Sequence, residues 1–138
     1  MSPSIFVYGT LRRASGHPSR RALMDGASFM GHGWIRGLLL DLGAYPGAVP
    51  DPSGEGRIRG ELYELARPRI ALPALDVYEG CAPRPGEPRL FRRVLSEVDL
   101  DGGAHRTAWV YWYIGSLSGA RTIPGGDYLD AARRDASE

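Results

Sequence analysis

The sequence predicts a mainly β domain, a barrel or a sandwich with irregular connections. Nineteen glycines and eleven prolines indicate many turns between short elements, which is unlike a helical bundle. Alternating apolar residues mark several segments of strand length, whereas one longer segment has the period of a helix. The length of 138 residues suits a single hydrophobic core, so we expect one domain over residues 1–138.

Short runs rich in β-branched and aromatic residues predict the strands. In chain order they are Ser4–Tyr8, Ala27–His32, Trp34–Leu42, Arg57–Leu65, Leu90–Leu100 and His105–Ile114. Gly31 and Gly33 allow a bend or a bulge between the second and the third. Asp101 and Gly102 form a hairpin-turn signal between the last two. The final strand is apolar on both faces, so we expect it in the centre of the sheet.

The main predicted helix is Arg67–Gly80, with Pro68 or Pro73 in its first turn and Gly80 as its left-handed stop. Two shorter helices are predicted, at Pro18–Met24 and from an Asp127 cap through Arg133. Loops are expected between these elements. They are Gly43–Gly56, Ala82–Pro88 and Gly115–Gly126.

Composition excludes several functions. The net charge of +1 gives no strong field for nucleic acid or an anionic membrane, and we expect neither as a partner. The chain has no lysine, which excludes Schiff-base and phosphate-loop lysines. Cys81 is the sole cysteine and the three histidines are scattered, so no metal site is predicted. The N-terminus lacks a signal-peptide pattern and no apolar run spans a bilayer, so we expect a cytoplasmic protein.

The segment Tyr8–Leu11 is the first candidate site. A strand ends at Gly9, and such a turn can point successive backbone N–H groups into one concavity, where they bind an anion or a developing oxyanion. Gly9 also lets a ligand approach the backbone closely. The residues fit a plain strand-ending turn equally well, with Tyr8 in the core and the Thr10 hydroxyl tying down its own turn.

Glu79 is the candidate acid–base group. On a helix, Leu72, Leu75, Asp76 and Glu79 share one face, and the two leucines indicate that this face looks inward. Partial desolvation would raise the pKa of the Glu79 carboxyl, which suits proton transfer near neutral pH. The spacing also allows Glu79 to face solvent in the last helical turn. Asp76 is expected to accept structural hydrogen bonds from the backbone or from an arginine.

Together these segments resemble the gamma-glutamylcyclotransferase-like family, of the gamma-glutamylamine cyclotransferase type. Phe6–Leu11 is similar to that family's Tyr-Gly-[Ser/Thr]-Leu loop, and Leu75–Cys81 to the segment that carries its catalytic glutamate. The similarity spans nearly the whole chain in order. Its other segments are Tyr45–Gly47, Gly60–Tyr63, Phe91–Val94, Ala108–Tyr111 and Gly126–Tyr128.

The resemblance implies an α+β fold, a small mixed β-barrel with one or two helices packed outside and a cavity at one end. It implies that the free α-amine of a γ-glutamyl group attacks its own side-chain amide, giving 5-oxoproline and a released amine or amino acid. No metal or cofactor is implied. The residues it assigns are Glu79 as general acid and base and, for binding the γ-glutamyl substrate, Tyr8, Gly9, Thr10, Leu11 and Tyr128.

Two alternatives remain open from the sequence. The same barrel can serve as a non-catalytic module that binds a small carboxylate, or as a related amide hydrolase or transferase. Arg12, Arg13 and Arg36 can meet a substrate carboxylate, although surface arginines are usually solvated. Cys81 is expected to be a buried or half-buried thiol without a catalytic role. The oligomeric state is not predicted.

Overall fold

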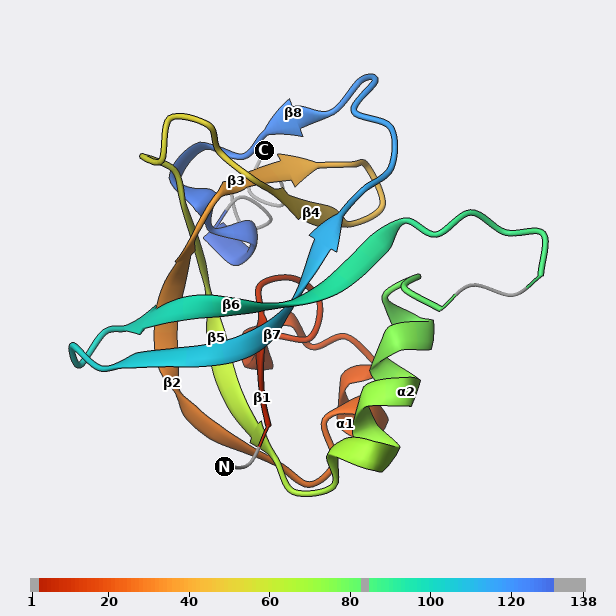
Figure 1. Ribbon diagram of the computed structural model, residues 1–138, viewed down its shortest axis with the longest axis vertical. Coiled ribbons are helices and arrows are strands. Elements are labelled where there is room, and N and C mark those ends of the chain that lie inside the picture. The colour runs from red at the N-terminus through yellow and green to blue at the C-terminus, as the bar shows by residue number, and fades with distance from the viewer. Residues whose placement is uncertain (1–2, 83–84, 131–138) are drawn as a thin grey trace.

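The computed structural model describes residues 3–82 and 85–130 of the chain (Figure 1). Its strands form one sheet in the order β1-β5-β2-β6-β7-β4-β3-β8. The strand bounds are β1 Ser4–Val7, β2 Ala27–Arg36, β3 Leu38–Asp41, β4 Pro46–Val49, β5 Arg57–Leu65, β6 Phe91–Leu100, β7 His105–Tyr113 and β8 Arg121–Thr122. The predicted mixed β-barrel is confirmed.

The barrel closes because β1 has two neighbours. It pairs antiparallel with β5 and parallel with β7, where Ile5 lies opposite Trp109. The closed part therefore contains β1, β5, β2, β6 and β7. The short strands β3, β4 and β8 extend the sheet at one end of the barrel (Figure 1). The predicted central position of His105–Ile114 is correct, since β7 contacts β6, β1 and β4.

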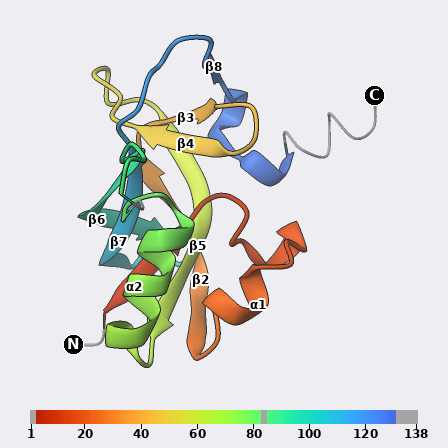
Figure 2. The ribbon, with the colours of Figure 1, turned by 90° about the vertical axis from the view of Figure 1, so that its right-hand side faces the viewer.

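Two helices lie side by side on the outside of the barrel (Figure 2). They are α1, Arg20–Leu23, and α2, Pro68–Tyr78. Pro68 occupies the first turn of α2 as predicted, and Gly80 has φ +72°, the left-handed geometry expected after a helix end. Asp127 accepts a hydrogen bond from the Asp130 N–H at 3.2 Å, so it caps the start of a helical turn at residues 128–130; the predicted continuation to Arg133 lies outside the described residues.

Residues 27–42 form two strands as predicted, but the predicted boundary between them, at Gly33, is wrong. The bulge at Gly31 is present, but β2 runs on through Gly33 to Arg36. The chain breaks at Gly37 instead, where φ is +154° and an added Cβ would lie 2.9 Å from the Val49 carbonyl oxygen. Only glycine fits a positive φ and so close a backbone approach at this point.

The predicted loop Gly43–Gly56 is also partly wrong, because it contains β4. This strand pairs with β3 and meets β7 at Ala48 and Trp112. The strand begins at Pro46. Proline is tolerated at the first residue of a strand, because its missing N–H does not interrupt the hydrogen bonds inside the strand. Proline and glycine in this segment hid the strand. Similarly, the expected loop Gly115–Gly126 contains the two-residue strand β8.

Two apolar clusters hold the fold together. One fills the barrel and includes Phe6, Tyr8 and Val110, and the other lies between the barrel and α2 and includes Leu11, Leu75 and Tyr111. Alternate residues of a strand face opposite sides, so β1 contributes to both clusters. The segment after β1 and the end of α2 are thereby brought to the same place.

Candidate active site

A cavity of about 350 Å³ lies between the loop after β1 and the C-terminal end of α2. Its wall contains Tyr8, Gly9, Thr10, Leu11 and Glu79. The structure therefore brings together five of the six residues that the sequence assigned to the site, although Glu79 is separated from the loop by more than sixty positions.

Tyr128, the sixth residue, does not line this cavity. Its ring packs against the cluster inside the barrel, which contains Tyr8. It also lies near Tyr78, whose hydroxyl pKa is raised chiefly by burial and slightly by Tyr128. Tyr128 is therefore a neighbour of the cavity wall, and its assignment to substrate binding stays a prediction.

The carbonyl groups of the loop Gly9–Leu11 all accept hydrogen bonds from the protein. Arg12 N–H donates to the Gly9 oxygen at 3.1 Å, the Ser15 hydroxyl donates to the Thr10 oxygen, and Arg20 Nε donates to the Leu11 oxygen at 2.9 Å. In a trans peptide the N–H points opposite to the C=O. The N–H groups of Thr10 and Leu11 therefore point away from these partners.

Those amides are free to bind an anion. In the described part of the chain, no turn or side-chain acceptor takes the N–H of Gly9, Thr10 or Leu11. Gly9 is required by space: an added Cβ would lie 3.0 Å from Cγ of Pro46, which forms another part of the cavity wall. The loop thus has the features of the anion site that the sequence suggested.

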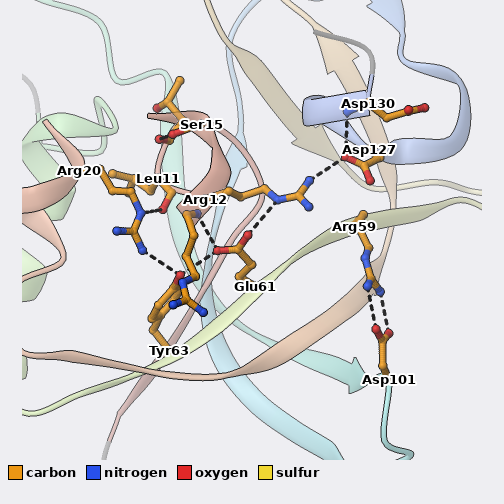
Figure 3. A network of polar contacts seen from close by, with 12 residues as sticks. Leu11, Arg12, Ser15, Arg20, Arg59, Glu61, Tyr63, Asp101, Asp127 and Asp130 are labelled. Carbon is orange, nitrogen blue, oxygen red and sulfur yellow. Dashed lines mark hydrogen bonds and ion pairs between the residues drawn. The ribbon is translucent and has the colours of Figure 1, made fainter. Parts of the chain in front are cut away.

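A network of buried charges supports the loop from the side of the barrel (Figure 3). Glu61 is only 2% exposed and accepts from Arg13 N–H at 2.8 Å, from the Tyr63 hydroxyl at 2.8 Å and from Arg12 Nε at 3.4 Å. Arg12 also donates to Asp127 at 2.8 Å, and Arg20 donates to the Tyr63 hydroxyl at 2.8 Å. The network fixes the loop on the side opposite the cavity.

This network corrects the suggestion that Arg12 is a surface residue able to meet a substrate carboxylate. Arg12 is 5% exposed, is paired with Glu61 and Asp127, and does not line the cavity. Arg13 places its guanidinium 4.7 Å from the centre of the Phe29 ring, and Arg36 is exposed away from the cavity. None of the three arginines reaches the candidate site.

Glu79 follows the last residue of α2 and faces the cavity. Burial raises the pKa of its carboxyl group from 4.5 to about 7. The C-terminal end of a helix carries partial negative charge, which also disfavours a carboxylate there. Within residues 3–82 and 85–130, the Glu79 side chain has no hydrogen-bond or ion-pair partner. The inward orientation is therefore correct, and the solvent-facing alternative is not what the structure has.

Asp76 has the structural role that the sequence suggested. Its carboxylate accepts from Arg93 Nε at 2.7 Å, from Arg93 Nη2 at 3.2 Å and from the Tyr111 hydroxyl at 2.7 Å. Its carbonyl oxygen accepts from Cys81 N–H at 2.8 Å. These bonds tie the last turn of α2 to β6 and β7, so the backbone of Glu79 is held in place. Cys81 is half-buried and does not line the cavity.

Tyr8 links the deep part of the cavity to the barrel. Its hydroxyl donates to the Tyr111 carbonyl oxygen at 2.6 Å and accepts from Ala48 N–H at 3.1 Å. Its pKa is raised far above its ordinary value, mainly by burial and then by the nearby Glu79. Tyr8 is therefore a neutral group that shapes the site.

The sequence did not single out His17 and Tyr78 as site residues, yet both line the cavity. The Tyr78 hydroxyl and Thr10 Oγ1 are 2.6 Å apart, a bond that joins α2 to the loop across the cavity. The His17 ring meets the Tyr78 ring edge-on, with centroids 6.0 Å apart. The position of Tyr78 next to Glu79 could have indicated that Tyr78 lies at the site. No local sequence pattern indicated the same for His17.

The cavity wall contains a carboxyl group, free amides and aromatic rings, but no arginine in the described part of the chain. No group of three His, Cys, Asp or Glu side chains among the described residues can hold a metal ion. No helix within the described ranges is both long and apolar enough to span a membrane. The arrangement can accept and return a proton at Glu79 and can bind an anionic oxygen at the loop.

The fold and the site define a small β-barrel protein whose cavity lies between an amide loop and a glutamate at a helix end, which has no partner among the described residues. Residues 5–130 match the family "Gamma-glutamyl cyclotransferase, AIG2-like", and the chain belongs to this family.

Relatives and solved structures agree with this membership. The gamma-glutamylcyclotransferase family protein YtfP of Escherichia coli K12 is 35% identical over 91% of this chain and 96% of its own length. The gamma-L-glutamyl-butirosin B gamma-glutamyl cyclotransferase of Niallia circulans is 32% identical over 80% of this chain and 67% of its own. An AIG2-like protein from mouse has a similar structure, with a TM-score of 0.69 and 25% identity over 92% of this chain and 88% of that one.

Proposed function

We propose that this protein closes the γ-glutamyl group of a small amide into 5-oxoproline and releases an amine. The observation that carries the proposal is one cavity shared by Glu79 and the amides of the loop Gly9–Leu11. Neither the desolvated Glu79 carboxyl group nor these amides have a partner among the residues that the structure describes. Membership of the cyclotransferase family and the activity named for the Niallia circulans relative support the same reaction class.

Glu79 acts as the proton carrier in this proposal. As a carboxylate it accepts a proton from the substrate's α-ammonium group, and the freed amine attacks the δ-carbonyl carbon of the same molecule. The new C–N bond forms as the carbonyl electron pair moves to oxygen. Glu79 then relays protons from the ring nitrogen to the leaving nitrogen, and the bond to the leaving amine breaks. Because nucleophile and electrophile belong to one molecule, the cavity has chiefly to fold it correctly.

The loop amides stabilise negative charge in this proposal. They bind either the oxyanion that forms at the δ-carbonyl or the α-carboxylate of the substrate. A well-aligned donor to an oxyanion lowers the activation free energy by about 3–4 kcal/mol. The supporting hydrogen bonds behind the loop keep these donors oriented before the substrate arrives, so no reorganisation is needed at the moment of reaction.

The cavity fits an amine as leaving group better than an amino acid. An amino acid brings a second carboxylate, and the described wall of the cavity offers no arginine to pair with it. The chain has no lysine at all. Apolar residues such as Val77, Leu90 and Phe91 instead form part of the wall. An unpaired carboxylate buried beside Glu79 would be costly, whereas an aliphatic amine substituent would gain from burial.

The direct test is to mix purified protein with γ-glutamyl amines and γ-glutamyl amino acids and to measure 5-oxoproline. We expect turnover of amines and a loss of about 10²- to 10⁴-fold in kcat/KM for Glu79→Gln, since this is the usual contribution of a general acid–base group. Glu87→Gln, in an exposed loop, is the control and keeps full activity. Equal activity of wild type and Glu79→Gln would refute the assignment. Binding of 5-oxoproline without turnover of any compound would support the small-carboxylate binding module instead.

The pH profile provides an independent check. The carboxylate form of Glu79 is required to accept the first proton, and its pKa is raised to about 7. We therefore expect kcat/KM to fall as pH drops below about 7, approaching a tenfold loss per unit. A profile that stays flat down to about pH 5 would exclude Glu79 as the base.

A further inference from the structure

His17 is a cavity residue that the proposed reaction does not use. It lies in the turn between the loop and α1, and its ring forms part of the cavity wall. Two contacts hold it there: its N–H donates to Ser15 Oγ at 3.2 Å, and its Nδ1 accepts from Ser19 N–H at 3.2 Å. Ser15 in turn donates to the Thr10 carbonyl. The position of the His17 ring is thus coupled to the loop.

These contacts define which ring nitrogen carries the proton. A nitrogen that accepts a hydrogen bond has no proton, so Nδ1 is bare and the proton of the neutral imidazole is on Nε2. Within the ranges 3–82 and 85–130, Nε2 has no hydrogen-bond partner. His17 therefore has one N–H available for a ligand.

His17 lies near the exposed part of the cavity wall. Val77 also lines the cavity and is 62% exposed, and it adjoins Tyr78, whose ring touches that of His17. The opposite end is deep, since Tyr8 and Tyr111 are almost fully buried. Glu79 interacts with both of these deep tyrosines. A γ-glutamyl group that reacts beside Glu79 with its leaving amine directed to the exposed side would bring that amine near His17.

We propose that His17 determines specificity for the leaving group, with Nε2–H donating a hydrogen bond to a neutral acceptor oxygen, such as an ether or hydroxyl, on the released amine. The inference rests on the proposed function, since it assumes a γ-glutamyl amide in this cavity. A neutral oxygen fits better than a carboxylate. A substrate carboxylate would place a second negative charge in the cavity beside the Glu79 carboxyl group, which no cation in the described wall pairs with.

The test compares amides that differ only by an oxygen in place of a methylene. One pair is γ-glutamyl-n-butylamide and γ-glutamyl-(2-methoxyethyl)amide, and a second is the n-pentylamide and the 3-methoxypropylamide. The measured quantity is the ratio of kcat/KM, ether to alkyl, from 5-oxoproline release. For wild type we expect about 3- to 10-fold preference for the ether in at least one pair, the usual effect of one neutral hydrogen bond.

Two variants separate the donor from the local structure. His17→Asn can still accept Ser19 N–H through its side-chain oxygen but lacks a donor at the Nε2 position, so the ratio falls to about one or below. His17→Gln places an amide N–H near the Nε2 position, and we expect it to restore part of the preference. If His17→Asn does not fold, His17→Phe keeps the ring and removes the donor, and the same ratio is measured.

The outcomes are distinguishable. Turnover with an ether preference that disappears in His17→Asn or His17→Phe and returns in His17→Gln supports the inference. Turnover with equal ratios in wild type and in the variants lacking the donor, or no ether preference in wild type, overturns the role of His17 and leaves the proposed reaction intact. No 5-oxoproline from any compound overturns both.

Discussion

The two sides of the loop Tyr8–Leu11 are built in opposite ways. On the side of the barrel, Glu61 accepts hydrogen bonds from Arg12, Arg13 and Tyr63, and the carbonyls of Gly9, Thr10 and Leu11 each have a donor. On the side of the cavity, Glu79 has no partner in the described part of the chain. The comparison shows that the protein concentrates its polar contacts behind the loop and leaves the facing side with unmet hydrogen-bonding capacity, where a ligand can bind.

The largest effect is expected from removing the supporting carboxylate. Glu61→Ala leaves the buried Arg12 with Asp127 as its only ion-pair partner among the described residues, and removes an acceptor for Arg13 N–H and Tyr63. Breaking a buried ion pair costs about 3–5 kcal/mol. Denaturant unfolding should show a loss of this size, and Glu64→Ala on the same strand should stay within about 0.5 kcal/mol of wild type. Equal losses would mean that the network is not the support of the loop.

Removing the carboxylate in the cavity is expected to stabilise the folded protein, the opposite of the effect expected at Glu61. The pKa of Glu79 is about 7 in the folded protein against an ordinary 4.5, so folding favours the protonated form. This stabilisation is present below pH 4.5 and is lost as pH rises through 7. Glu79→Gln should therefore unfold like wild type at pH 4 and be more stable by up to about 3 kcal/mol at pH 8.

Thermal or urea unfolding at both pH values measures this difference, with Glu87→Gln as an exposed control. A Glu79→Gln protein that is less stable than wild type at pH 8 would show that the Glu79 carboxylate has an attractive partner. The contrast between the two sides of the loop would then be wrong.

A smaller loss is expected at Asp76. Asp76→Asn replaces a charged, two-point contact with Arg93 by a neutral one and weakens the acceptor for Tyr111. We expect a loss of about 1–3 kcal/mol, the usual value for a hydrogen-bonded charge that is partly buried. Asp101→Asn is the matched control, because Asp101 makes a similar two-point contact with Arg59 in a half-exposed setting. If both variants lose the same stability, burial of the Asp76 contact contributes little.

The smallest change in stability is expected from Gly9→Ala, at about 1 kcal/mol. The added Cβ would lie 3.0 Å from Pro46, so the loop must shift slightly. Gly102→Ala, in a hairpin where nothing lies within 4 Å of the added Cβ, is the control. Steady-state kinetics sharpens the comparison: a change in kcat indicates that the loop binds the oxyanion, and a change in KM indicates the α-carboxylate. An unaltered kcat and KM would exclude the loop from both roles.

Much of the fold could be predicted from the sequence because its signals are local. The strand Ser4–Tyr8, the hairpin at Asp101 and Gly102 and the helix ending before Gly80 each depend on residues that lie close together in the chain. The strand β4 was missed because proline and glycine dominate its sequence, and its pairing with β3 and β7 is a tertiary effect.

The site was predictable where the pattern matched a family and not where it depends on folding. The sequence predicted that Glu79 and the loop share one site, and the structure places them in one cavity. The roles of Arg12 and Glu61 were not, because an arginine after a loop and a glutamate on an alternating strand both suggest surface positions. Their burial results from mutual pairing across forty-nine positions. His17 enters the cavity through contacts with Ser15 and Ser19 that its own sequence does not indicate.

The parallel contact of Ile5 with Trp109 has a consequence for how the chain acquires its site during synthesis. The strand β7 emerges from the ribosome about a hundred residues after its partner β1. Until then Tyr8 has no Tyr111 carbonyl to bind, and Glu79 has no deep wall behind it. Contacts so distant in sequence form slowly, so the nascent chain contains Glu79 and the loop long before the cavity that encloses them is complete.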